Sequence, residues 1–145
     1  MKKNIGFTLI ELLISISIIA ILSVILSVSF SNAQKNSRDQ RRIADLKAVQ
    51  NAAEQYYLLS GSYPVAANYR TTSGAWVVNS QIILQKFPGD PQIINGVGIT
   101  YSTYNNSTTS YCVCAKMEKN QNSNAENNQC GFSNSTGFFC VKNQQ

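Results

Sequence analysis

The feature that most constrains this chain is a long apolar run near its N-terminus that contains one carboxylate. From Phe7 to Phe30 the sequence has 24 residues, and Glu11 is the only charged residue among them. At a rise of about 1.5 Å per residue, such a helix is about 36 Å long, enough to cross a hydrocarbon core of about 30 Å. The run therefore predicts a membrane-spanning helix. An ionisable group inside a membrane is costly unless it is paired, so Glu11 suggests a functional role.

Two ordinary explanations of the apolar run compete. The first is a cleaved secretory signal, with Lys2 and Lys3 as its basic start and Ser31–Ala33 as a small-residue cleavage site. However, the run exceeds the usual apolar length of about 7–15 residues in such signals. The second is a plain single-pass anchor in which the side chain of Glu11 reaches the membrane surface. Neither explanation gives the carboxylate a purpose.

The polar remainder of the chain indicates an exported protein without catalytic machinery. The chain has no His, which removes the commonest general base and metal ligand. Its net charge of +5 does not by itself indicate a nucleic-acid-binding surface. The sequence has no paired carboxylates and no Gly-rich phosphate loop, so we expect neither an enzyme nor a cofactor. An even number of cysteines behind an apolar N-terminal segment predicts disulfides formed outside the cytoplasm. These cysteines are Cys112, Cys114, Cys130 and Cys140.

The string GFTLIELLISI, residues 6–16, resembles the class III signal of the type IV pilin and pseudopilin family. In that family a short basic leader ends in Gly, the mature chain starts with Phe, and its fifth residue is Glu. The resemblance implies that a membrane-embedded prepilin peptidase cuts between Gly6 and Phe7, removing the leader (residues 1–6), and N-methylates Phe7. It also implies that Glu11 meets the freed amine of Phe7 on a neighbouring subunit. Such a charge pair would fix the register of a filament more than it would add stability.

We expect the helix to continue beyond the membrane as the spine of a head domain. Residues 34–59 contain neither Pro nor Gly, whereas Gly61 and Pro64 provide a stop signal. This predicts one helix over residues 7–60, of which 7–30 form the transmembrane and filament-core half. Apolar residues at helical spacing give the other half a buried stripe. The stripe consists of Leu46, Val49, Ala53 and Tyr56, flanked by Ile43 and Leu59.

Charged residues on the same helix predict pairs on its solvated face. Arg41 and Asp45 are four residues apart, and Arg42 and Asp45 are three apart. Pairs at these spacings face each other on a helix and stabilise it by about 0.2–0.5 kcal/mol each.

Residues 61–145 predict a small globular head with an antiparallel sheet. The segment 62–98 is interrupted by Pro and Gly, so we expect a long connection with at most a short element at 80–86. Alternating, β-branched and aromatic residues then predict strands at 98–104, 110–118 and 137–142. With one face of the sheet on the helix stripe, the predicted fold class is α+β, and the resemblance implies a pilin-like arrangement.

The spacing of the cysteines limits how they can pair. On a strand, Cys112 and Cys114 point to the same face about 6.5–7 Å apart, with parallel side chains that are poorly placed to bond to each other. We therefore expect each to bond to one of Cys130 and Cys140, without specifying which. The alternative is a zinc site made of all four thiolates, although the Cys-x-Cys spacing is unlike the usual zinc knuckle.

The resemblance implies a structural subunit of a type IV pilus-like filament, which would serve adhesion, twitching motility or DNA uptake. The implied partners are further copies of the chain, the prepilin peptidase and an inner-membrane assembly platform. Because disulfides need an oxidising compartment, we place the N-terminus in the cytoplasm and the head outside. The precursor would be a single-pass protein of the cytoplasmic membrane and the product an extracellular filament.

Two alternative functions are kept. The first is a major pseudopilin of a type II secretion system. Several such proteins hold calcium with acidic residues in C-terminal loops, but beyond residue 91 this chain has only Glu118 and Glu126. The second is a minor pilin acting as an adhesin or DNA receptor, with Lys116, Lys119 and Lys142 beside Tyr111 or Phe138 as its phosphate contacts.

Glycosylation is also allowed by three Asn-x-Ser/Thr sequons. These sequons begin at Asn105, Asn106 and Asn134.

Overall fold

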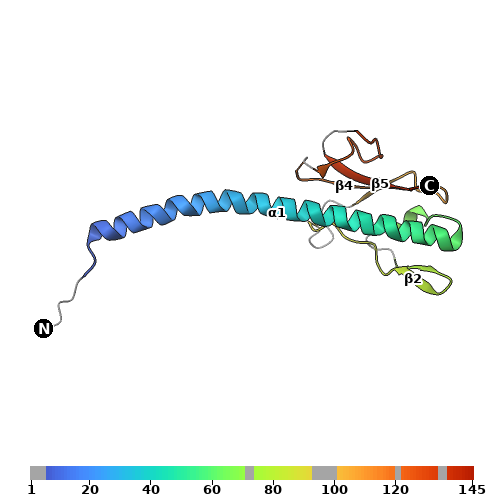
Figure 1. Ribbon diagram of the computed structural model, residues 1–145, viewed down its shortest axis with the longest axis horizontal. Helices are drawn as coiled ribbons and strands as arrows, with labels where there is room; N and C mark the ends of the chain where they lie inside the picture. Colours follow the sequence, from blue (N-terminus) through green and yellow to red (C-terminus); the bar gives the residue numbers. More distant parts are fainter. Residues whose placement is uncertain (1–5, 71–73, 93–100, 120–121, 134–136) are drawn as a thin grey trace. The chain divides into compact units, whose positions relative to one another are not determined.

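The computed structural model describes residues 6–70, 74–92, 101–119, 122–133 and 137–145. It divides into two compact units, the first ending at Gln34 and the second running from Lys35 to Gln145. Helix α1 (Leu9–Ser60) has 52 residues and, within the described residues, is followed by a short 3-10 helix and five strands (Figure 1). The predicted α+β class with one long N-terminal helix is thus confirmed.

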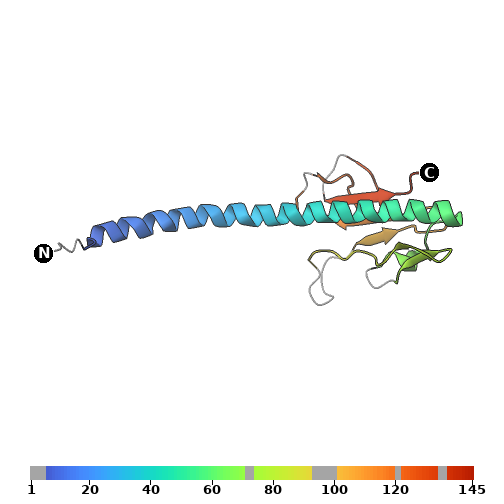
Figure 2. The ribbon, with the colours of Figure 1, turned by 60° about the horizontal axis from the view of Figure 1, so that its bottom comes forward.

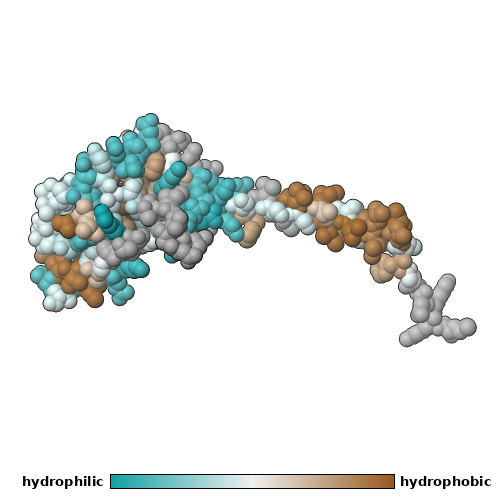
Figure 3. Space-filling view, turned by 180° about the vertical axis from the view of Figure 1, so that it is seen from behind, coloured by the Kyte–Doolittle hydropathy of each residue, from teal (hydrophilic) through white to brown (hydrophobic). Residues whose placement is uncertain are grey.

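The N-terminal unit is a stretch of α1 whose described apolar side chains are all exposed. Ile10 is 59% exposed and Ile21 is 63% exposed, and Figure 3 shows this apolar stretch of the helix in brown. Two serines of this stretch satisfy their hydroxyls within the helix. The hydroxyls of Ser15 and Ser23 donate to the carbonyl oxygens four residues earlier, both at 2.8 Å. Within the described residues, α1 is the one helix that is long and apolar enough to cross a membrane.

In the C-terminal unit, α1 packs against a three-stranded antiparallel sheet in the order β3-β4-β5. Its strands are β3 (Ser102–Tyr104), β4 (Cys112–Lys116) and β5 (Phe138–Lys142). Val113 faces Val141 and Cys114 faces Cys140 across β4 and β5. The three predicted strands are therefore present with shorter bounds, while residues 98–100 of the first prediction lie outside the described residues.

The connection after α1 contains more structure than expected. A 3-10 helix, η1 (Ala66–Asn68), precedes a hairpin made of β1 (Trp76–Val78) and β2 (Gln81–Leu84). The short element expected at 80–86 is β2, but its partner β1 was missed. Asn79 and Ser80 form the two-residue turn with φ of 50° and 65°. Such a turn needs positive φ at both positions and normally has Gly at the second, so Asn-Ser gave a weak signal.

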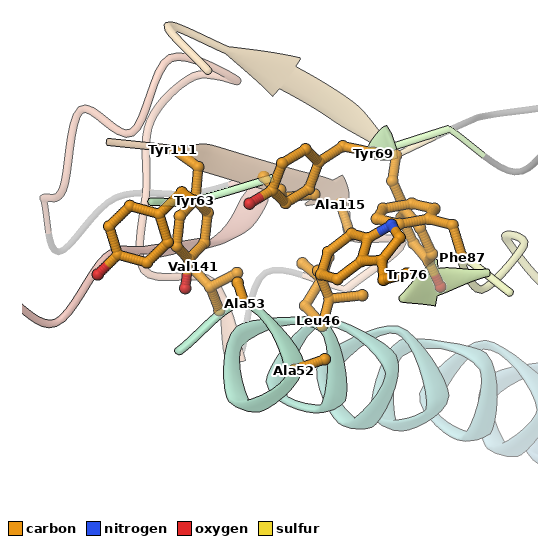
Figure 4. Packing of buried hydrophobic residues seen from close by; sticks show 13 residues of the cluster. Leu46, Ala52, Ala53, Tyr63, Tyr69, Trp76, Phe87, Tyr111, Ala115 and Val141 are labelled. Atoms are coloured by element: carbon orange, nitrogen blue, oxygen red, sulfur yellow. The ribbon is translucent and has the colours of Figure 1, made fainter. Parts of the chain in front are cut away.

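The core of the head is built from small side chains on the helix and large rings around it (Figure 4). Leu46, Val49 and Ala53 of the predicted stripe are fully buried, whereas Leu59, which was expected to flank it, is 43% exposed. Tyr69 meets Trp76 edge to face with ring centroids 5.0 Å apart. Pairs of this kind are worth about 0.5–1.5 kcal/mol beyond the area they bury. Other buried rings are Tyr63, Phe87, Tyr101 and Tyr111.

Figures 1 and 2 together show how the chain surrounds the C-terminal half of α1. Strands β4 and β5 lie along one side of it, and the β1–β2 hairpin lies along another. The helix is thus the central element of the head, and its polar residues can reach loops from both sides.

Candidate functional site

The predicted processing site lies just before α1. Gly6 and Phe7 precede the first helical residue, and Phe7 is 90% exposed. A Cβ atom built on Gly6 would meet no atom within 4 Å. Among the described residues, Gly6 and Phe7 are therefore non-helical and exposed.

Glu11 takes part in a contact that our sequence analysis did not anticipate. Its Oε2 accepts hydrogen bonds from the backbone N–H of Thr8 at 2.9 Å and from the Thr8 hydroxyl at 2.7 Å. In return the Thr8 Oγ1 accepts the N–H of Glu11 at 3.3 Å. This reciprocal arrangement is a capping box, which satisfies free N–H groups at the start of a helix. The Thr-x-x-Glu spacing was readable in the sequence and should have been recognised.

The capping box uses one carboxylate oxygen of Glu11 and leaves the other. Among the described residues, Oε1 has no hydrogen-bond or ion-pair partner. The side chain therefore keeps one acceptor oxygen that no described group of the chain engages.

The predicted surface pair between Arg42 and Asp45 is wrong, because Arg42 binds other carboxylates. Its side chain is fully buried and its guanidinium binds Asp90 through two hydrogen bonds, 2.8 and 3.0 Å long. A third bond of 2.7 Å goes to Asp39 and a fourth of 2.9 Å to Glu118. The physical reason is its position, because residue 42 lies one helical turn before Leu46 and therefore on the buried stripe.

Asp39 and Arg38 complete this charged cluster, which we define as Arg38, Asp39, Arg42, Asp90 and Glu118. Asp39 accepts the backbone N–H groups of Glu118 at 2.9 Å and Lys119 at 2.7 Å. Arg38 holds both oxygens of Glu118 at 2.7 and 2.6 Å. The Arg38 hydrogen bonds are the largest influence on the pKa of Glu118, which falls to about 2 although partial burial opposes the change. The charged cluster thus ties α1 to the loop at Asp90 and to the end of β4.

Two further carboxylates of α1 hold the head in a similar way. Asp45 lies 4.0 Å from Arg41, as expected, and accepts the hydroxyl of Tyr101 at 2.8 Å. Glu54 accepts the hydroxyls of Tyr63 at 2.9 Å and Tyr111 at 3.2 Å. It also accepts the backbone N–H of Gln144 at 3.0 Å. Burial, followed by the Glu54 hydrogen bond, raises the pKa of Tyr63 to about 12.

The four cysteines form two disulfides in the head. Cys112 of β4 bonds to Cys130, and Cys114 of β4 bonds to Cys140 of β5. The first bridge attaches the segment 122–133 to the sheet, and the second joins neighbouring strands. Within the described residues no cysteine is free, so the alternative zinc site would require reduced sulfurs.

The structure brings together only part of the set of residues considered for nucleic-acid binding. Tyr111 is 2% exposed and cannot stack on a base, so its suggested role is wrong. Lys116 and Lys142 lie at opposite ends of the β4–β5 pair, facing Phe138 and Cys112 respectively. The Lys142 ammonium instead lies 5.1 Å from the centroid of the Phe132 ring.

The residues considered for calcium binding and for glycosylation lie in different surroundings. Glu118 belongs to the charged cluster, whereas Glu126 is exposed. At the sequons, Asn105 is exposed, but Asn106 accepts the N–H of Cys112 at 3.0 Å and its amide nitrogen is buried. Asn134 lies outside the described residues.

Comparison with known proteins identifies relatives of this chain. The family model described as "Prokaryotic N-terminal methylation motif" matches residues 1–27. The chain is 32% identical over 115 residues to the "Type IV wide pilus major component PilA4" of Thermus thermophilus, covering 79% of this chain and 75% of that protein. It is 30% identical over 64 residues to the "Type II secretion system core protein G" of Vibrio cholerae, covering 44% of each chain. No solved structure matches the chain significantly.

These matches agree with the architecture. The methylation motif covers Gly6, Phe7 and Glu11. The match to the pilus component covers 79% of this chain and therefore includes most of the head. The exposed apolar helix and the small antiparallel sheets suit a subunit that leaves a membrane to join a filament. The chain therefore belongs to the type IV pilin and pseudopilin family and is a structural subunit rather than an enzyme.

Proposed function

We propose that this chain is a structural subunit of a type IV pilus-like filament and assembles through its N-terminal helix. The observation that carries the proposal is the 32% identity to a pilus major component over 75% of its length, together with the methylation motif. The exposed apolar surface of residues 9–25 supports it, because such a surface must be covered by lipid before assembly and by neighbouring helices afterwards. As in the family, the filament would serve adhesion, twitching motility or DNA uptake.

Maturation begins with a cut between Gly6 and Phe7 by a prepilin peptidase, followed by N-methylation of Phe7. The leader (residues 1–6) is lost and Phe7 gains a positively charged amine. Thr8 and Glu11 are retained, so the capping box can form in the mature chain. The N-terminus faces the cytoplasm in the precursor, and the disulfide-bonded head lies on the oxidising side.

Assembly then brings the new amine of Phe7 on one subunit to Glu11 of its neighbour. Oε2 of Glu11 stays with Thr8, and Oε1 receives the incoming cation. Two opposite charges in a low-dielectric surrounding attract strongly, and an unpaired charge there is costly. The pair therefore favours one axial register over others. An inner-membrane assembly platform would supply the subunits in this register.

A type II secretion pseudopilin is the second candidate, supported by the match to core protein G. That match covers 44% of each chain, whereas the pilus component is matched over most of its length. A calcium site needs several oxygen ligands together, and Glu118 is engaged by Arg38 and Arg42. These observations favour the pilus.

Mass spectrometry of the mature N-terminus tests the proposal. The expected product begins with N-methylated Phe7. A product that begins at Gln34 would indicate an ordinary signal peptide, and one that retains Met1 would indicate an uncleaved anchor. Either of the last two results would overturn the proposed maturation.

A further inference from the structure

The two disulfides of the head lie in contact with each other. The Sγ atom of Cys114 is 3.7 Å from the Sγ of Cys112 and 3.9 Å from the Sγ of Cys130. Cys114 belongs to one bridge, whereas Cys112 and Cys130 form the other. These three sulfur atoms lie within 4.8 Å of one another. Thiol–disulfide exchange proceeds by attack of a thiolate on a neighbouring disulfide sulfur, so this proximity permits exchange between the two bridges.

The bridges differ in their access to solvent. Cys114 and Cys140 are 0% and 2% exposed, so the bridge between them is closed to an outside reagent. Cys112 is also buried, at 5%, but Cys130 is only half-buried. Sγ of Cys130 is therefore the atom at which an incoming thiolate can attack the two disulfides.

We propose that Cys130 is a thiol-exchange site through which an external dithiol, either a small molecule or a dithiol oxidoreductase, controls both bridges. In the first step, a thiolate of the dithiol attacks Sγ of Cys130, and Cys112 leaves as a thiolate. The second thiol of the dithiol then attacks the mixed disulfide and releases Cys130. The dithiol is oxidised to a disulfide, and its two electrons reduce the Cys112–Cys130 bridge.

The second step is internal and needs no further reductant. The Cys130 thiolate attacks Sγ of Cys114, 3.9 Å away in the intact structure. A Cys114–Cys130 bond forms, the Cys114–Cys140 bond breaks, and Cys140 leaves as a thiolate that takes up a proton. The number of disulfides does not change in this step, so its electron balance is closed.

Cys130 is the attacking group although Cys112 is slightly closer to Cys114. Attack by Cys112 would join two residues on the same face of one strand, whose side chains run parallel and are poorly placed for a bond. Cys130 comes from a separate segment and does not have this restriction. The product keeps the segment 122–133 attached to β4, while β5 loses its covalent link to β4. Run in reverse, the same steps close the buried bridge during oxidative folding.

Limited reduction of the full-length protein in detergent micelles tests this proposal. The protein is treated with dithiothreitol below the amount needed for full reduction, quenched with acid, unfolded and alkylated, and the remaining disulfide is mapped by peptide mass spectrometry. We expect a species with alkylated Cys112 and Cys140 and a Cys114–Cys130 bond. If the one-bridge species contain only the two original bonds, no transfer takes place and the proposal is wrong.

A matched pair of double variants isolates the role of access. The variant C112S/C130S keeps only the buried bridge, and C114S/C140S keeps only the bridge that includes Cys130. We expect dithiothreitol to reduce the buried bridge of C112S/C130S about tenfold more slowly than the same bridge in the unmodified chain, since the relay is missing. Equal rates would contradict the proposal. The mapping on the unmodified chain decides the question even if a variant does not fold, and neither result depends on filament assembly.

Discussion

Arg42 and Asp90, 48 positions apart in the sequence, form a two-hydrogen-bond ion pair in which neither side chain is accessible to solvent. The pair fixes the loop that follows Phe87 against α1. Asp39 and Glu118 bind the same guanidinium, so the charge of Arg42 is shared among three carboxylates. Removing one of these partners should destabilise the fold strongly, because it leaves a buried charge without full compensation.

We predict that Asp90→Asn destabilises the head by about 3 kcal/mol, since it leaves Arg42 buried with less compensation. The variant keeps the shape of the side chain and removes only its charge. Urea unfolding of the full-length protein in micelles, followed by the fluorescence of the buried Trp76, measures the change. Arg41→Ala is the control, because Arg41 is 67% exposed and 4.0 Å from Asp45. Its effect should be below about 0.5 kcal/mol, and equal effects of the two changes would contradict a dominant role for the buried pair.

The charged cluster also predicts how stability depends on pH. Hydrogen bonds from Arg38 lower the pKa of Glu118 from 4.5 to about 2 in the folded protein. A carboxyl group with a lowered folded pKa stabilises the protein above its unfolded pKa, and this contribution is lost as the pH falls through the folded value. Stability should therefore decrease between about pH 4.5 and about pH 2. Urea midpoints across this range should change less in Glu118→Gln, whereas Glu126→Gln, at an exposed position, should keep the original slope. The same slope in all three proteins would exclude Glu118 as the source.

Variants at the start of α1 separate the capping contact of Glu11 from its proposed pairing with the Phe7 amine. Glu11→Ala should leave the cut after Gly6 intact and impair filament assembly, because the mature subunit lacks a partner for the Phe7 amine. Glu11→Gln keeps an acceptor for Thr8 but has no charge, so it should also impair assembly. Thr8→Val removes the hydroxyl of the capping box and keeps the carboxylate, so filaments should still form. Normal filaments from Glu11→Gln, seen by electron microscopy, would show that capping alone accounts for this residue.

Calcium distinguishes the pilus from the secretion-system alternative. Because Glu118 is held by arginines and Glu126 is exposed, we expect the melting temperature of the protein to be the same in calcium and in a chelator. A clear increase with calcium, measured by circular dichroism, would instead support the pseudopilin function.

Much of the fold was predictable because its elements follow strong local patterns. The apolar run, the stripe through Leu46 and Val49, and the stop at Gly61 each define a part of α1, whose last residue is Ser60. The sequence patterns at β4 and β5 likewise predicted that these segments form strands. Strand β1 was missed because three residues are too few for a pattern and its turn, Asn79–Ser80, lacks the usual Gly.

The candidate sites were less predictable for two different reasons. Arg42 was placed on the solvated face because charged residues are rarely buried, and its partner Asp90 is too distant in sequence for any local pattern to reveal. The contact between the disulfides likewise depends on how the segment around Cys130 folds back over β4. The capping box at Thr8, in contrast, is a local motif and was available from the sequence alone.

The most direct test of the central claim is a near-atomic structure of the native filament. Our account predicts that the methylated amine of Phe7 lies within hydrogen-bond distance of the Glu11 carboxylate on an adjoining subunit, while Thr8 keeps the other oxygen. A filament in which the carboxylate contacts only its own Thr8, with no cation from a neighbour, would contradict the proposed basis of assembly.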